Sequence, residues 1–207
     1  MYIICPTSNV GSPEKRDRFL SLLSNVAETT LSSETDARAY AWFRSAADND
    51  KVPHHWVQGF EVYDHLEAST VTHRSSDAYK AFRSAVGAEG LLDRGSDLGY
   101  LQPTGFGFLI REPVIFQSGS QPNGGYVVVE RMRAAGGSSG RVALLEVLRT
   151  VAESVGKASL VDAVASFWVL EYRPEDQDLT IVVFQRFESK RAYEEAFLRD
   201  SKIERLR

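Results

Sequence analysis

The chain has 207 residues, of which 43% are hydrophobic and 25% charged, and its formal net charge is −4. This composition is typical of a globular protein and excludes a disordered or fibrous chain. An acidic balance without a run of Lys or Arg excludes the electrostatic footprint of a nucleic-acid-binding protein. The single cysteine, Cys5, excludes an internal disulfide and a cysteine-based zinc cluster.

The N-terminal segment "MYIICPTSNV" holds only a short apolar stretch and has no basic flank. A signal peptide or a membrane span needs a longer apolar run. We therefore expect a soluble, cytoplasmic protein that does not contact a membrane.

The first half of the chain predicts the order strand, helix, strand, strand, helix, strand. A strand at residues 2–5 precedes a helix whose apolar side chains recur at the spacing of one helical face. Ser12 and Pro13 supply this helix with an N-cap and a first-turn proline. The remaining strands are predicted at residues 37–45, 55–64 and 105–113, with a broken helix between the last two.

The second half repeats this order. Its strands are predicted at residues 126–129, 163–172 and 179–188, and "TVAESV" in its first helix echoes "NVAETT" in the earlier one. The order β-α-β-β-α-β is that of the ferredoxin-like unit. We therefore predict an α+β fold of two tandem ferredoxin-like units, with unit 1 at residues 1–116, a linker at 117–125 and unit 2 at 126–207.

A ferredoxin-like sheet has helices on one face only, yet both faces of the third strand in each half carry apolar groups. This pattern predicts burial of both faces. We infer that the helix-free faces pack on each other as an intrachain dimeric α/β barrel, which would make the chain a monomer, with a further surface homodimer left open. The second half has no evident fourth strand, so either a strand at 98–112 serves both sheets or the chain ends early.

Residues 61–82, "EVYDHLEASTVTHRSSDAYKAF", run from a strand into a helix and carry a recognisable motif. Its members are Glu61, Tyr63, Asp64, Glu67-Ala68, His73-Arg74-Ser75-Ser76 and Phe82. This motif resembles that of the antibiotic biosynthesis monooxygenase type of the dimeric α+β barrel superfamily, here in tandem form. The second half has Gln185, Phe187 and Phe197 in place of Glu61, Tyr63 and His73.

The resemblance implies a cofactor-independent monooxygenase of secondary metabolism that acts on an aromatic, polyketide-type small molecule with O2. A deprotonated phenolic or anthrone-type substrate can pass an electron to O2 itself, so the protein need only bind it, remove a proton and stabilise the anion. The same fold hosts cyclases, isomerases and decarboxylases with the same needs. A non-catalytic small-molecule binder is the alternative of a different class. Ala78 stands where some relatives have a further histidine, which argues against a haem-degrading role.

His73 and Tyr63 are the predicted catalytic residues. His73 falls where the helical segment breaks, which would let its ring point between helix and sheet, and imidazole is a common proton-transfer group near neutral pH. Tyr63 shares a strand face with Glu61 and Gly59, and Gly59 would leave room for a ligand. The plain alternatives are a histidine that satisfies helix-end carbonyls and a tyrosine of the core.

Further substrate-binding candidates lie on the neighbouring strand. Tyr40, Trp42 and Arg44 share one face, and an arginine beside aromatic walls could hold a carboxylate or phenolate. By aligning Asp50 with Asp178, we match them with Trp168, Leu170 and Tyr172 of the second half. Simple core packing is the alternative for the aromatic residues.

His55 is predicted at the start of the third strand, where it or His54 could reach a pocket. A metal site built from these histidines, His65 and an acid would be poorly spaced, so we expect neither a metal nor a cofactor. A self-pairing duplicated unit needs two copies for its barrel but only one pocket for chemistry. We therefore expect the active site in the first half and a scaffold in the second.

Overall fold

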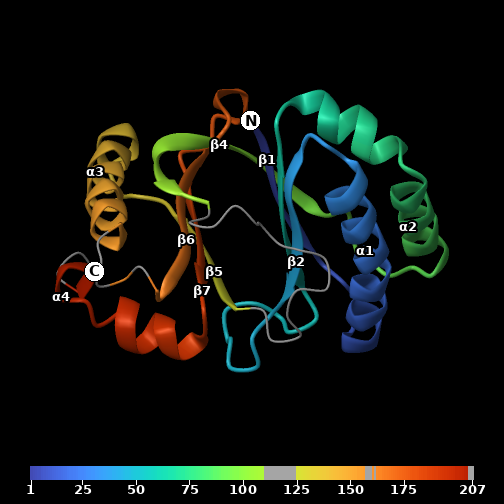
Figure 1. Ribbon diagram of the computed structural model, residues 1–207, viewed down its shortest axis with the longest axis horizontal. Helices are drawn as coiled ribbons and strands as arrows, with labels where there is room; N and C mark the ends of the chain where they lie inside the picture. Colours follow the sequence, from blue (N-terminus) through green and yellow to red (C-terminus); the bar gives the residue numbers. More distant parts are fainter. Residues whose placement is uncertain (110–124, 157–159, 161, 205–207) are drawn as a thin grey trace. The chain divides into compact units, whose positions relative to one another are not determined.

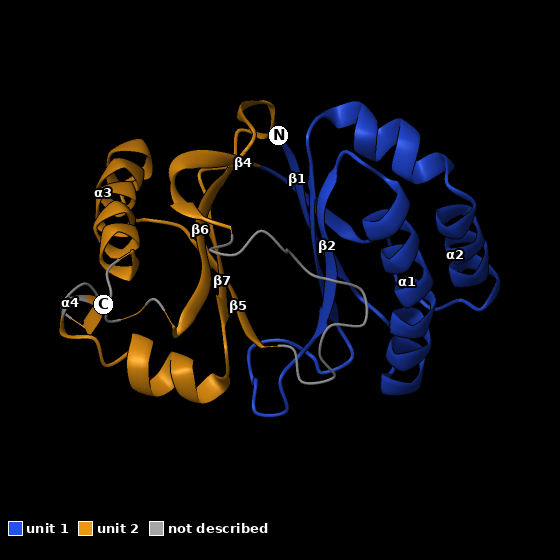
Figure 2. Ribbon diagram, viewed as in Figure 1, with its two compact units in different colours: residues 1–101, 115–119 blue, residues 102–114, 120–207 orange. Residues whose placement is uncertain are grey.

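The structure is a computed structural model that describes residues 1–109, 125–156, 160 and 162–204 (Figure 1). The chain divides into two compact units, with residues 1–101 in unit 1 and residue 102 onward, among those described, in unit 2 (Figure 2). Most of the predicted linker at 117–125 lies outside the described residues, so the predicted domain boundaries remain a prediction. None of the described helices is long and apolar enough to cross a membrane.

Unit 1 has the predicted order of elements. They are β1 (Tyr2–Ser8), α1 (Pro13–Ser33), β2 (Ala37–Arg44), β3 (Val57–Tyr63), the π-helical turn η1 (Ala68–His73), α2 (Asp77–Ala88) and the start of β4 (Asp97–Phe108). The strands are hydrogen-bonded in the order β2-β3-β1-β4, and each neighbouring pair is antiparallel.

Helices α1 and α2 cover one face of the unit 1 sheet (Figure 1). The Ser12 hydroxyl caps α1 by accepting a hydrogen bond from the Lys15 N–H at 3.2 Å, as the sequence predicts. Phe19 of α1 and Phe82 of α2 pack edge-to-face in the core beneath the helices. The side chains of alternate β3 residues point into this layer, which determines where the predicted site residues lie.

Unit 2 repeats the pattern. Its elements are the later part of β4, β5 (Tyr126–Met132), α3 (Gly137–Val155), β6 (Val164–Tyr172), the 3-10 turn η3 (Pro174–Asp176), β7 (Ile181–Phe187), the π-helical turn η4 (Ala192–Phe197) and α4 (Ser201–Glu204). Their strand order is β4-β6-β7-β5. The core joins one face of β6 and β7 to α3, η4 and α4.

Strand β4 supplies the fourth strand of each unit. Its residues 97–101 pair with β1 in unit 1, and in unit 2 the Thr104 hydroxyl donates to the Val169 carbonyl at 2.8 Å. The strand that the sequence predicts at 105–113 therefore starts earlier, at Asp97, and residues 110–113 lie outside the described part. The predicted α+β fold of two ferredoxin-like units is confirmed, with one strand serving both.

Gly107 allows β4 to lie close to β6. Its φ is +86°, and a Cβ atom at this position would stand 2.3 Å from the Phe167 carbonyl oxygen. Only glycine combines that backbone conformation with so short an approach.

Candidate functional site

The predicted residues His73, Tyr63 and Tyr40 meet beneath the helices of unit 1. His73 ends η1 and is 2% exposed, and its ring centroid lies 5.7 Å from that of Tyr63 and 5.1 Å from that of Tyr40. Tyr79 of α2 adds a third ring at 4.9 Å. The sequence thus predicts a cluster that the structure assembles from separate elements.

A π-helical turn positions His73 at the predicted break. The helical segment starts shortly after β3 and continues as η1, and Ser76 then caps α2 by accepting from the Tyr79 N–H at 3.2 Å. The Asp64 carboxylate, just before this segment, binds the Arg38 guanidinium, which lowers the pKa of Asp64.

A buried carboxylate, that of Glu34, holds the His73 ring. His73 Nδ1 lies 3.1 Å from Glu34 Oε2 and 3.2 Å from Thr30 Oγ1, and the Thr30 hydroxyl donates to Glu34 Oε1 at 3.2 Å. Because a carboxylate accepts hydrogen bonds, this network assigns the proton to Nδ1 in the neutral ring and leaves the lone pair on Nε2. A histidine oriented by a carboxylate in this way is equipped to take up a proton.

A second carboxyl group lies on β3 at the same cluster. The Tyr63 hydroxyl donates to Glu61 Oε2 at 3.0 Å, and both residues are buried. Burial raises the pKa of Glu61, and the neighbouring His73 acts in the opposite direction. Burial, followed by the Glu61 charge, raises the pKa of both Tyr63 and Tyr40, so both phenols stay protonated.

The space expected beside Gly59 is filled. A Cβ atom on Gly59 would stand 2.6 Å from Pro6 Cγ and 3.0 Å from the Trp42 ring. Glycine here makes room for Trp42 rather than for a ligand.

The other two predicted binding residues lie away from the cluster. Arg44 shares the face of Tyr40 and Trp42 but is exposed at the end of β2. His55 lies in a turn before β3, which begins at Val57 and not at residue 55, so its side chain is not held by the sheet.

The predicted correspondence between the halves is wrong by one residue in β6. Glu61 pairs with Tyr40 in unit 1, whereas its equivalent Gln185 pairs with Phe167 in unit 2. Phe167, Val169 and Glu171 therefore match Tyr40, Trp42 and Arg44, while Trp168, Leu170 and Tyr172 face the other side of the sheet.

Sequence reasoning missed Glu34 and Thr30, although both leave a signal. Glu34 caps the C-terminal end of α1, where the helix dipole disfavours an acid. Thr30 continues the buried stripe of Phe19, Leu23 and Val26 as its polar member. A polar end to an apolar helical stripe indicates a buried polar partner.

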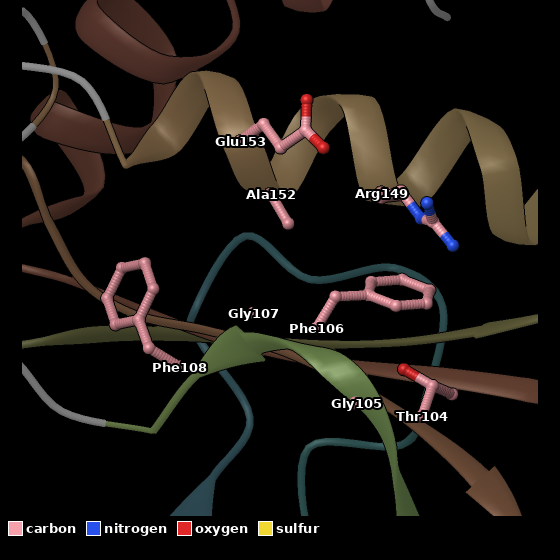
Figure 3. A pocket seen from close by; sticks show the side chains of 8 residues that line it. All are labelled: Thr104, Gly105, Phe106, Gly107, Phe108, Arg149, Ala152 and Glu153. Atoms are coloured by element: carbon pink, nitrogen blue, oxygen red, sulfur yellow. The ribbon is translucent and has the colours of Figure 1, made fainter.

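Described residues of unit 2 line two hollows. One is a cavity of about 270 Å³ between α3 and the sheet. The other is an open groove of about 450 Å³ where α3 passes over the end of β4, with the Arg149 guanidinium set 6.0 Å from the centre of the Phe106 ring (Figure 3). Across the described part of the chain, no three His, Cys, Asp or Glu side chains are grouped to hold a metal ion.

No known protein family matches the sequence as a profile, and no curated protein matches it. Solved structures do resemble it in fold. Two carry the name "putative monooxygenase": one from Fusobacterium nucleatum (10% identity, TM-score 0.74, covering 99% of this chain and 82% of that one) and one from Lactobacillus acidophilus (8% identity, TM-score 0.73, covering 99% and 85%).

An anthrone oxidase-like protein is similar over the same extent, with 12% identity and a TM-score of 0.60, and the match covers 99% of this chain and 82% of that one. At these identities the likeness is one of fold. The chain thus has the fold of these two monooxygenase-named proteins across almost its whole length, and the resemblance identified in the sequence is confirmed at the level of the fold.

Proposed function

We propose that the chain is a monooxygenase-type enzyme that oxidises an aromatic small molecule with O2 and needs no resident cofactor. The observation that supports this most is the buried pair of His73 and Glu34, which lies against Tyr63 and Glu61. Proton removal from a weak carbon acid requires a base that is held in place and hydrogen-bond donors for the anion that forms, in a site that excludes water. The carboxylate-held imidazole and the neighbouring phenols meet these requirements.

The reaction we propose converts an activated ring methylene and O2 into a ring ketone and water. His73 Nε2 takes a proton from the methylene, and the resulting carbanion passes one electron to O2. The radical pair joins to form the C–O bond of a peroxide, and the His73 imidazolium returns its proton to the outer oxygen. Loss of the remaining C–H proton then breaks the O–O bond and gives the ketone and water, so both oxygen atoms and all four electrons are accounted for.

Each residue of the cluster has a part in this scheme. Glu34 holds the His73 ring and balances the imidazolium that forms, as the carboxylate of a catalytic triad does. Tyr63 can turn its hydroxyl from Glu61 toward the developing enolate oxygen. The cluster is closed in the structure, and Tyr79 is its half-buried ring, so we expect the substrate to enter by displacing Tyr79.

Oxygen uptake with an anthrone-type substrate tests the proposal. We expect one O2 consumed per ketone formed, in protein whose metal content has been measured. His73→Asn should remove most of the rate, whereas His54→Asn, at an exposed turn, should keep it. One equivalent of haem or iron bound per chain would contradict the proposal that the enzyme needs no cofactor. Full activity of His73→Asn would contradict the proposed role of His73.

A second candidate function is a cofactor-free cyclase, isomerase or decarboxylase, since these reactions use the same base and anion clamp. It predicts product formation under nitrogen at the aerobic rate. A third, a non-catalytic binder, is favoured by one observation: the cavity of about 270 Å³ lies in unit 2, away from His73. It predicts ligand binding without turnover by the wild-type chain.

A further inference from the structure

The cavity of unit 2 has one polar atom that the protein leaves unpaired. Gln185 on β7 is 1% exposed, and its Oε1 is a buried acceptor for which the described residues provide no donor. Gln185 lines the cavity of about 270 Å³. A buried amide oxygen without a donor is rare in a native protein and calls for an explanation.

Glu130 determines which end of this amide is unpaired. Gln185 Nε2 donates to Glu130 Oε2 at 2.7 Å. A carboxylate only accepts hydrogen bonds, so a flipped amide would place two acceptors against each other. The nitrogen is thereby held toward Glu130, and Oε1 is the atom left to accept a hydrogen bond from an occupant of the cavity.

Almost all other walls of the cavity are apolar. They come from α3, the strands, η4 and α4, and include Leu144, Leu148, Phe167, Tyr193, Phe197 and Ile203. A cavity of about 150 Å³ lined by aliphatic and aromatic side chains is enough to bind benzene. The unit 2 cavity is nearly twice that size, so it suits one or two fused rings.

The comparison with unit 1 shows which polar groups the cavity lacks. Register places Gln185 where unit 1 has Glu61, and Phe167 where it has Tyr40. In unit 1 the rings of Tyr40 and Tyr63 lie against His73, whereas in unit 2 Phe167 and Phe187 lie against Phe197. Unit 2 has no histidine, so its cavity keeps the shape of a binding site and lacks an imidazole base.

We propose that the unit 2 cavity binds a neutral, flat, apolar molecule of one or two rings that donates one hydrogen bond to Gln185 Oε1. A phenol or naphthol has this chemistry. An anionic ligand is disfavoured, because Glu130 stands beside Gln185 and none of the described lining residues carries a positive charge. This site is separate from the cluster around His73, and the proposal does not depend on the proposed function.

Calorimetric titration of the full chain with 1-naphthol and with naphthalene tests the proposal. We expect one 1-naphthol per chain, bound more tightly than naphthalene, which has the rings but no donor. Gln185→Leu removes the acceptor at similar volume, so it should weaken 1-naphthol about five- to tenfold and leave naphthalene unchanged.

Two further variants locate the site. Val147 lies at the rim of the cavity and is 36% exposed, so Val147→Trp should block both probes. Val142, on the same helix but 60% exposed and not at the cavity, provides the control Val142→Trp, which should bind as wild type does. Equal affinity for the two probes, no binding of either, or unchanged 1-naphthol affinity in Gln185→Leu would overturn the proposal. Circular dichroism of each variant confirms that it is folded.

Discussion

Glu34 and His73 form a buried hydrogen-bonded pair with Oε2 and Nδ1 3.1 Å apart, although 39 positions of sequence separate them. The carboxylate caps α1 and the imidazole ends η1, so the contact exists only once the helices have packed on the unit 1 sheet. Under the proposed function, catalysis and stability therefore depend on the same contact.

We predict that Glu34→Ala destabilises the chain, because His73 Nδ1 loses its acceptor inside the core. The expected loss is about 1–3 kcal/mol of unfolding free energy, measured by denaturant titration. His54→Ala, on the surface, should stay within about 0.5 kcal/mol of wild type. Equal stability of the two variants would show that the pair contributes nothing.

Glu34→Gln separates positioning from folding. The amide retains an acceptor for His73 but cannot balance an imidazolium, so we expect kcat to fall about 100-fold or more while the fold is kept. Steady-state oxygen uptake measures this, with the melting temperature as the control. An unchanged kcat would mean that His73 acts without the carboxylate.

The pH dependence of stability should reveal Glu61. Burial raises the pKa of this carboxyl in the folded chain, so the folded state binds its proton more tightly than the unfolded state does. Its favourable contribution is therefore complete below the unfolded pKa of about 4.3 and is lost as the pH rises through the folded pKa.

Glu61→Gln removes this titration while still accepting from Tyr63. We expect its unfolding free energy to exceed that of wild type at pH 7, with the difference disappearing toward a pH of about 4. Urea titrations across this range measure both chains. A difference that grows as the pH falls would show that the pKa of Glu61 is lowered instead. Unit 2 already has glutamine at the equivalent position, Gln185.

The periodic features of this fold could be predicted from sequence, and the contacts across elements could not. The apolar stripe that includes Phe19 and Leu23 is visible in one helix, and its echo in the second half indicates a repeat. The register of β6 could not be predicted by aligning Asp50 with Asp178, because the loop at 45–56 is longer than the loop at 173–180. A loop alignment therefore misplaces the strand by one residue, which exchanges its faces.

Only the part of the candidate site that lies within one stretch of sequence could be predicted. His73, Tyr63 and Glu61 belong to one contiguous motif, so spacing alone places them together. Glu34 meets them only through the packing of α1 on the sheet. The open cavity of unit 2 depends on which rings fill the space, and a sequence pattern gives no measure of that volume.

Substitutions of two glycines in β4 should differ in cost. Both have positive φ, +94° at Gly105 and +86° at Gly107, but only at Gly107 would a Cβ atom meet backbone, 2.3 Å from the Phe167 carbonyl oxygen. We expect Gly105→Ala to lose about 1 kcal/mol from backbone strain and Gly107→Ala to lose clearly more. Equal losses in denaturant titrations would show that β4 can move away from β6 without penalty.

The oligomeric state tests the proposed barrel. On the face of β3 opposite His73, Phe60 and Val62 are fully buried, as is Ile3 beside them on β1. The intrachain barrel predicted from the sequence would cover this face and make the full chain a monomer held by its own tether. A fragment of residues 1–116 leaves these apolar groups without that cover, and burial of such surface is worth about 25 cal/mol per Å².

The fragment of residues 1–116 should therefore self-associate in sedimentation velocity at concentrations where the full chain sediments as a monomer. A stable monomeric fragment would show that the two units are independent domains and that the barrel does not form.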